Sequence, residues 1–291
     1  MKKIFFTSAF LTSCLLANSE ISTNYTYKDY DNSKTKTNGK TIDYRFLHNF
    51  ESSQIVINYE DSLTKRENEI TKAKLTSLEV EKLSMKYLYH ISDELSFKTS
   101  FINIEDNLAP TDDGKIYGLG LIKNMNSSTG IKIDTYLSDY EDFNVNQYDL
   151  TFVKKFKLDN INLEAQLGSK YININGQNYG NYILKDNYFL SYFLNLNANY
   201  NGFIFGLGFM NGDRLFAIQE DGLKVEHHAL EQNKTYMVSL GKKFKNIDLI
   251  SRYIYSNSNE LPENRNDVKS QFVSLGLNYK FRLWYIYKYI L

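Results

Sequence analysis

Cysteine and proline are scarce in this sequence, whose 291 residues include one cysteine and two prolines. A single cysteine forms no disulfide bond within the chain and no multi-thiolate metal site, so disulfide-stapled folds are excluded. Proline cannot donate a hydrogen bond to a β-ladder and is confined to connections or edges in strand-rich proteins. Pro110 and Pro262 both lie in polar stretches, which leaves the rest of the chain free for strand pairing.

Long apolar runs and net charge are also lacking. Beyond the N-terminus, no segment approaches the roughly 20 consecutive apolar residues of a transmembrane helix, so a helical membrane protein is excluded. The 34 Lys and Arg residues are balanced by 34 Asp and Glu residues. Because nucleic-acid-binding proteins carry a basic excess, we expect no binding to nucleic acid.

Aromatic residues are abundant, with 24 tyrosines and 19 phenylalanines, and they occur in segments where apolar and polar residues alternate. Residues 161–168 alternate without exception, and residues 188–200 form the longest such segment. Side chains two residues apart share one face of a strand, so each segment predicts a strand with one apolar and one polar face. The sequence contains about fourteen such segments, with 12 to 16 possible, and no helix signal of useful length.

The connections between the predicted strands are alternately short and long. Short turns include residues 92–94 and the Asn201-Gly202 pair, in which both residues tolerate positive φ. Long polar loops are predicted over residues 30–40, 61–74 and 211–233. Bulky aromatic residues stand at the short-turn ends, namely Phe50, Phe156, Tyr200, Phe244 and Phe281. Short turns at one end, long loops at the other and an aromatic girdle are typical of transmembrane β-barrels.

The N-terminus has the pattern of a secretory signal peptide over residues 1–19. Lys2 and Lys3 precede an apolar run, and small residues follow where a signal peptidase cleaves. We place the mature start near Glu20. An alternative is a lipoprotein box at residues 11–14, which would place a lipid on Cys14.

Residues 271–281, QFVSLGLNYKF, form the segment that identifies the class of barrel. One face is continuously apolar and only Phe272 breaks the alternation; the apolar residues are Val273, Leu275, Leu277, Tyr279 and Phe281. This segment resembles the terminal strand of Gram-negative outer-membrane β-barrels, whose last residue is usually Phe. The resemblance implies export through the periplasm, residence in the cell outer membrane, and recognition of this strand by the barrel-insertion machinery.

Residues 282–291, RLWYIYKYIL, follow the expected terminal Phe281 and form an atypical tail that contains the only tryptophan, Trp284. Three interpretations are open: a natural extension at the periplasmic interface, a distorted extra pairing, or a reading-frame artefact.

The strand pattern therefore predicts an all-β fold, a transmembrane antiparallel up-and-down β-barrel over residues 20–281. A soluble β-sandwich would also alternate. However, some fourteen faces rich in Leu, Phe and Tyr would need a very large core, whereas a closed barrel places them in lipid and pairs every backbone polar group internally.

The overall pattern resembles the small monomeric porins of about fourteen strands, and the resemblance carries no residue-specific motif. It implies a channel for passive diffusion of ions and small polar solutes, a monomer without cofactor or metal, with long loops restricting the mouth. Charged side chains of mixed sign on the polar faces are expected to line the pore, with basic groups slightly ahead: Arg45, Lys86, Lys98, Lys132, Asp134, Asp149, Lys155, Glu164, Asp248 and Arg252.

Two other functions are compatible with the pattern. An outer-membrane hydrolase, a protease or phospholipase, would need catalytic groups at the mouth; the loop of residues 211–233 contains the candidates Asp213, Asp221, Glu226, His227 and His228. Adjacent histidines point apart on an extended chain, so we expect no enzyme. The third possibility is an adhesin or structural barrel with a plugged lumen.

Overall fold

The structure is a computed structural model that describes residues 18–175, 187–261 and 265–282. It consists of strands joined by turns. Their bounds are β1 Asn18–Asp31, β2 Lys36–Asn49, β3 Ser53–Glu67, β4 Lys74–His90, β5 Leu95–Asp106, β6 Lys115–Asn126, β7 Thr129–Asp139, β8 Asn144–Leu158, β9 Ile161–Asn175, β10 Tyr188–Tyr200, β11 Phe203–Arg214, β12 Ile218–Gln219, β13 Lys224–Val225, β14 Leu230–Phe244, β15 Ile247–Glu260 and β16 Arg265–Arg282.

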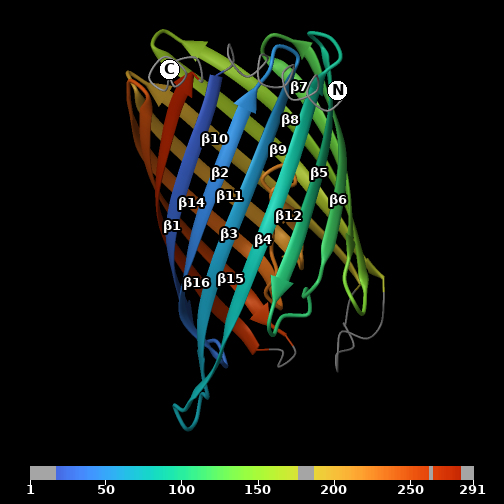
Figure 1. Cartoon of the computed structure of the whole chain (residues 1–291), viewed down its shortest axis with the longest axis vertical. Coiled ribbons are helices and arrows are strands. Elements are labelled where there is room, and N and C mark those ends of the chain that lie inside the picture. The colour runs from blue at the N-terminus through green and yellow to red at the C-terminus, as the bar shows by residue number, and fades with distance from the viewer. Residues whose placement is uncertain (1–17, 176–186, 262–264, 283–291) are drawn as a thin grey trace, which may run out of the picture.

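Fourteen of these strands close into one antiparallel barrel, in which each strand pairs with its neighbours in the chain (Figure 1). The barrel is sealed where β1 meets β16, with Asn18 opposite Arg282 and Asp31 opposite Lys269. The predicted up-and-down barrel of about fourteen strands is therefore confirmed. β12 and β13 do not join the wall but pair only with each other, as a separate two-stranded hairpin.

The two ends of the barrel differ as the sequence predicts. The start of β1 and the end of β16 lie at the same end (Figure 1). Connections at this end are short, such as residues 127–128, 159–160, 201–202 and 245–246. The opposite end has the longer connections, such as residues 68–73, 107–114 and 215–229, the last between β11 and β14.

Two predicted loops are wrong. Residues 30–40 were expected to be a long polar loop, but β1 continues to Asp31 and β2 starts at Lys36, so only residues 32–35 remain. Residues 61–74 were expected to be a long charged loop, but β3 continues to Glu67 and β4 starts at Lys74, so only a six-residue turn, 68–73, remains. The two strands extend as a hairpin beyond the rest of the barrel (Figure 1). Backbone pairing between two strands does not depend on an apolar outer face, so β3 and β4 stay paired beyond the part of the barrel that lipid surrounds.

The outer face of the barrel is apolar. Leucine, tyrosine and phenylalanine side chains are exposed along the outward-facing positions of the strands, including Leu275 of β16 at 62% and Tyr148 of β8 at 54%. A surface of this size without a protein partner is what a barrel surrounded by lipid requires. Four of the five apolar residues of the terminal segment lie on this face, and Phe281 stacks on Tyr279 with ring centroids 5.8 Å apart.

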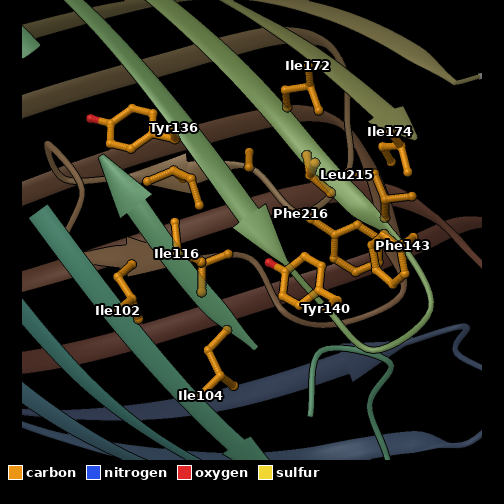
Figure 2. Packing of buried hydrophobic residues seen from close by; sticks show 14 of the residues in the cluster. Ile102, Ile104, Ile116, Tyr136, Tyr140, Phe143, Ile172, Ile174, Leu215 and Phe216 are labelled. Atoms are coloured by element: carbon orange, nitrogen blue, oxygen red, sulfur yellow. The ribbon is translucent and has the colours of Figure 1, made fainter. Parts of the chain in front are cut away.

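The inner face is polar near the short-turn end but apolar along one part of the long-loop end. There, inward-facing isoleucines of β5, β6 and β9 meet residues of the 215–229 segment and the β7–β8 turn in one buried cluster (Figure 2). The alternating pattern predicted a polar inner face for every strand, and these isoleucines are an exception to it. Phe272, the exception to the alternation of β16, also faces inward, and its ring lies 5.9 Å from that of Tyr30.

Several predicted features fall on residues outside the described part of the chain. These are nearly all of the signal peptide, with Cys14 and the lipoprotein alternative, and the tail from residue 283 onward. Within the described ranges, no helix has the length and apolar character needed to cross a membrane.

Candidate functional site

The segment between β11 and β14, residues 215–229, folds inward and lies inside the barrel; we call it the inner loop. Its hairpin carbonyls accept hydrogen bonds from the barrel wall, Val225 from Lys82 Nζ at 3.2 Å and Leu223 from Ser84 Oγ at 2.8 Å. The sequence predicted a loop that restricts the mouth of the barrel. The structure instead places it in the lumen, where it narrows the passage.

An apolar stretch at the start of the inner loop anchors it. Residues 215–218, Leu-Phe-Ala-Ile, are at most 1% exposed and belong to the buried cluster of Figure 2. The ring of Phe216 lies 5.1 Å from that of Phe143 and 5.9 Å from that of Tyr140. Phe216 has a φ of 56°, which is unfavourable for a bulky residue and persists only where surrounding packing enforces it. This end of the loop is therefore fixed.

Polar wall residues hold the backbone next to this anchor. Gln147 of β8 donates from Nε2 to the Ile218 carbonyl at 3.0 Å and accepts from the Ile218 N–H at 2.7 Å. Lys170 of β9 donates to the same carbonyl at 2.9 Å and pairs with Asp149 at 2.6 Å. The predicted lining residue Asp149 thus lies on the inner wall, where it fixes the lysine that holds the loop.

The tip of the hairpin is a tight left-handed turn pressed against the wall. Glu220, Asp221 and Gly222 have φ values of 50°, 57° and 89°. Gly222 packs so closely that an added Cβ would collide with Ser100 Oγ of β5 and lie 3.0 Å from the ring of Tyr136 of β7. Glycine is required here both for its backbone conformation and for this close approach.

Predicted lining residues of three wall strands converge on the tip. The Asp221 carboxylate lies 4.0 Å from Lys86 of β4, 3.5 Å from Lys98 of β5 and 3.4 Å from Lys132 of β7. Lys98 also pairs with Asp134 of β7 at 2.7 Å. Burial would raise the pKa of Asp221, but the three lysines outweigh burial and hold this pKa well below its usual range.

A second set of ion pairs flanks the first. Glu220 pairs with Arg45 of β2 at 2.6 Å, and Lys224 pairs with Asp43 of β2 at 3.0 Å. Glu60 of β3 lies 3.9 Å from Lys224 and 2.8 Å from Lys82. Burial alone would raise the pKa of Glu220, but Lys224 and Arg45 lower it to about 2. The tip therefore stays charged over the physiological pH range.

The other predicted lining residues make no ion pair with the inner loop in the described part of the chain. Asp248 of β15 is buried and pairs with Lys280 of β16 at 2.6 Å. Lys155 and Glu164 face each other across β8 and β9 near the short-turn end, and Glu164 accepts a hydrogen bond from Gln166. Arg252 lines the lumen cavity described next. The sequence placed ten charged residues in one group, whereas the structure gathers five of them, Arg45, Lys86, Lys98, Lys132 and Asp134, around the tip.

A cavity of about 550 Å³ remains beside the inner loop. It is bordered by loop residues such as Glu220 and Lys224 and by wall residues of β1 to β3, β7 to β11 and β14 to β16, among them Asn24, Asn195 and Arg252. Both charge signs line it.

The histidines of the inner loop do not form a catalytic pair with a carboxylate. The sequence predicted that these adjacent side chains point apart, but their rings are 4.2 Å from each other. The His228 Nε2 contacts the Tyr30 hydroxyl at 3.2 Å. His227 Nε2 and His228 Nδ1 have no hydrogen-bond partner in the described part of the chain. Burial, with nearby Lys28 and Lys82, lowers both histidine pKa values well below their usual range. No group of three potential metal ligands occurs among the described residues.

Sequence reasoning missed the residues that seat the inner loop, above all Gln147, Lys170, Glu220 and Lys224. One signal was available. The apolar run at 215–218 interrupts a polar loop, and such a run is normally buried. The polar partners carried no comparable signal, because their spacing across several strands is set only by barrel closure.

Comparisons with known proteins extend the fold assignment. No family model and no curated protein matches the sequence. Among solved structures, the chain is similar to a bacterial polysaccharide outer membrane secretin, with a TM-score of 0.55 and 10% identity, over 92% of this chain and 99% of that chain. Two others are Pseudomonas aeruginosa OpdL, with a TM-score of 0.48 and 10% identity over 92% of this chain and 99% of that one, and Acinetobacter baumannii OccAB3, with a TM-score of 0.43 and 11% identity over 91% and 99%.

At these identities the similarity concerns the fold alone. It agrees with the closed antiparallel barrel described above. The chain has the β-barrel fold found in bacterial outer-membrane proteins.

Proposed function

We propose that this protein is an outer-membrane channel through which ions and small polar solutes diffuse passively. The observation that carries the proposal is a polar, charged cavity of about 550 Å³ inside a barrel whose outer face is apolar. A fourteen-stranded barrel is wider than the eight-stranded kind that side chains fill, so water is expected in its lumen.

The inner loop makes this a restricted channel. It packs against the wall at β4, β5 and β6, and the remaining cavity is lined by residues of the other barrel strands, β1 to β3, β7 to β11 and β14 to β16. The ten predicted lining residues supply six basic and four acidic groups, so we expect weak ion selectivity. A passage bordered by both signs favours small polar solutes over apolar ones.

The expected partners follow from the same proposal. Outer-membrane lipid surrounds the apolar face, and the barrel-insertion machinery recognises Val273, Leu275, Leu277, Tyr279 and Phe281 of β16. The protein acts as a monomer without cofactor or metal.

Planar-bilayer recording of the purified protein tests the channel. Stable open steps are expected. Arg252→Glu, which reverses a charge at the cavity, should shift the reversal potential in a salt gradient toward cation preference. Lys123→Glu is the matched control, because Lys123 lies two residues after outward-facing Leu121 on β6 and shares its outer face; it should leave selectivity unchanged. Equal shifts from both variants would contradict passage along the cavity.

A second candidate is a structural or adhesive barrel that does not conduct. It is favoured by the packing of residues 215–218 into the apolar part of the wall, which fixes an obstruction inside the lumen. Bilayers that stay silent, while the protein retains the heat-modifiable gel migration of a folded barrel, would support this candidate over the channel.

A further inference from the structure

Three lysines of the barrel wall surround one carboxylate of the inner loop. Lys86 and Lys132 have Asp221 as their only ion-pair partner in the described part of the chain, and Lys98 has Asp221 and Asp134. With Asp221 removed, three ammonium groups would face a single carboxylate. Like charges gathered around one point repel each other, so an anion between them stabilises the cluster.

The lysine positions belong to the wall and not to the loop. Lys98 is buried, with 3% of its side chain exposed, and lies against Asp134, two strands away on the same inner face. Gly120 of β6 makes room for this pair, because an added Cβ there would collide with Asp134 Oδ1 and lie 2.9 Å from Lys98 Cε. The site is therefore built into paired strands and remains in place when the loop tip leaves.

A second basic group lies beside the three lysines. Glu220, the neighbour of Asp221 in the chain, pairs with Arg45 at 2.6 Å. The two adjacent carboxylates of the tip thus bind two adjacent basic groups of the wall, the three lysines and Arg45. A short dicarboxylic acid carries the same pair of carboxylates and could bind the same basic groups.

The tip can separate from the wall while the base of the loop stays. Residues 215–218 are held by apolar packing, which added anions do not weaken, whereas the tip is held largely by ion pairs, which anions in solution screen and compete with. Consecutive left-handed φ values at Glu220 and Asp221 are unfavourable and are relieved on release.

We propose that Lys86, Lys98 and Lys132, with Arg45, form a binding site for a small dicarboxylate, and that Asp221 and Glu220 are its resident occupants. A dicarboxylate entering the lumen competes with the tip, displaces it and widens the passage. The inference rests on the proposed channel function for its physiological role, and it is testable without conductance.

Thiol labelling of the tip tests the displacement, with succinate as probe. In a chain carrying Cys14→Ser, Leu223→Cys introduces a cysteine at a position that is 3% exposed. A small maleimide should label it slowly in buffer and about tenfold faster in saturating succinate, because the labelling rate follows the population of the released tip. Sodium chloride of equal ionic strength and acetate should have smaller effects.

Matched variants separate the site from general screening. Lys86→Gln with Lys132→Gln should label fast without succinate and show no further response to it. Lys155→Gln, which removes an inner-face lysine near the other end of the barrel, should behave like the parent. If succinate and sodium chloride of equal ionic strength accelerate labelling of the folded parent equally, the proposed site is refuted.

Calorimetry tests the competition itself. Asp221→Asn leaves the lysines in place but removes the charged occupant, so it should bind succinate about tenfold more tightly than the parent, since the competing state no longer reduces the apparent affinity. Equal or weaker binding would overturn the proposal. If succinate accelerates labelling and binds but the bilayers stay silent, the dicarboxylate site is retained and the channel is rejected. If the bilayers conduct but succinate neither accelerates labelling nor binds, the channel is retained and the site is rejected.

Discussion

The side-chain amide of Gln147 hydrogen-bonds both backbone groups of Ile218, as a neighbouring strand would. Both residues are 1% exposed. A segment that leaves the wall and enters the lumen has no ladder partner for its N–H and C=O groups, and buried groups without partners are costly. One glutamine on β8 therefore satisfies the loop at the point where its apolar anchor ends and its charged tip begins.

Gln147→Ala should loosen the inner loop without unfolding the barrel. It leaves the buried Ile218 N–H unpaired, which costs roughly 1–3 kcal/mol, while Lys170 still holds the carbonyl. Hydrogen exchange at the Ile218 amide should accelerate accordingly. Gln166→Ala is the control, because the Gln166 amide donates to Glu164 on the same strand; it should leave exchange at Ile218 unchanged.

Gly222→Ala should displace the tip by steric means alone. The new methyl group would collide with Ser100 and approach Tyr136, at a φ that already disfavours side chains. A cost of about 1–2 kcal/mol corresponds to roughly a five- to thirtyfold rise in the released population. Limited proteolysis within residues 219–224 measures this rise.

Gly202→Ala provides the comparison for that variant. Gly202 also has positive φ, 79°, but the nearest atom to an added Cβ is 3.6 Å away. It should therefore cost backbone strain only and leave proteolysis of the inner loop unchanged. Equal sensitivity of the two variants would show that the tip is not seated against Ser100 and Tyr136.

The fold was predictable because alternation is local. In residues 161–168, the alternation of apolar and polar residues assigns each side chain to one face of the strand. The wall of a barrel is built from strands with this pattern alone. The interior was harder to predict. On β5, Phe101 faces outward, whereas Ile102 and Ile104 face inward. Both faces of this strand are therefore apolar there. This break in the pattern marks the wall that receives the inner loop, and it is visible only when inward residues of several strands are compared.

The candidate site was half predictable for the same reason. Arg45, Lys86, Lys98 and Lys132 lie on polar strand faces, and alternation alone assigns them to the lumen. Their common partner, Asp221, lies in a loop, and a loop's path depends on packing that strand periodicity does not contain. Asp221 was considered only as part of a catalytic group at the mouth.

Acid should release the inner loop. Burial lowers the pKa values of His227 and His228 in the seated loop, and the released loop has ordinary values near 6.5. The released state therefore binds more protons below about pH 6.5. The free energy that favours the seated loop over the released loop falls by up to about 1.4 kcal/mol per pH unit for each histidine. Labelling at Leu223→Cys, with rates corrected for thiolate fraction, should rise from pH 7 to pH 5.

The carboxylates of the tip do not account for that effect. Glu220, with its pKa lowered to about 2, contributes stability that is present above its ordinary value near 4.3 and is lost only as the pH falls toward 2. His227→Gln combined with His228→Gln should accordingly flatten the dependence of the labelling rate on pH between pH 7 and pH 5. Glu220→Gln should raise the labelling rate at every pH in this range without changing how steeply it depends on pH. A steep profile in the double histidine variant would assign the transition to other groups.

Two arginine substitutions on β16 test which face of the barrel meets lipid. Leu275 is 62% exposed on the outer face, and arginine at the middle of a membrane span costs roughly 2–4 kcal/mol. Leu275→Arg should therefore lower the free energy of unfolding in lipid vesicles by that amount. Asn278→Arg, three residues later on the inner face opposite Asp248, gains a carboxylate partner and should cost little. Equal losses from the two variants, or a folded protein that stays in solution without detergent or lipid, would contradict an outer face in lipid, and the channel proposal depends on that assignment.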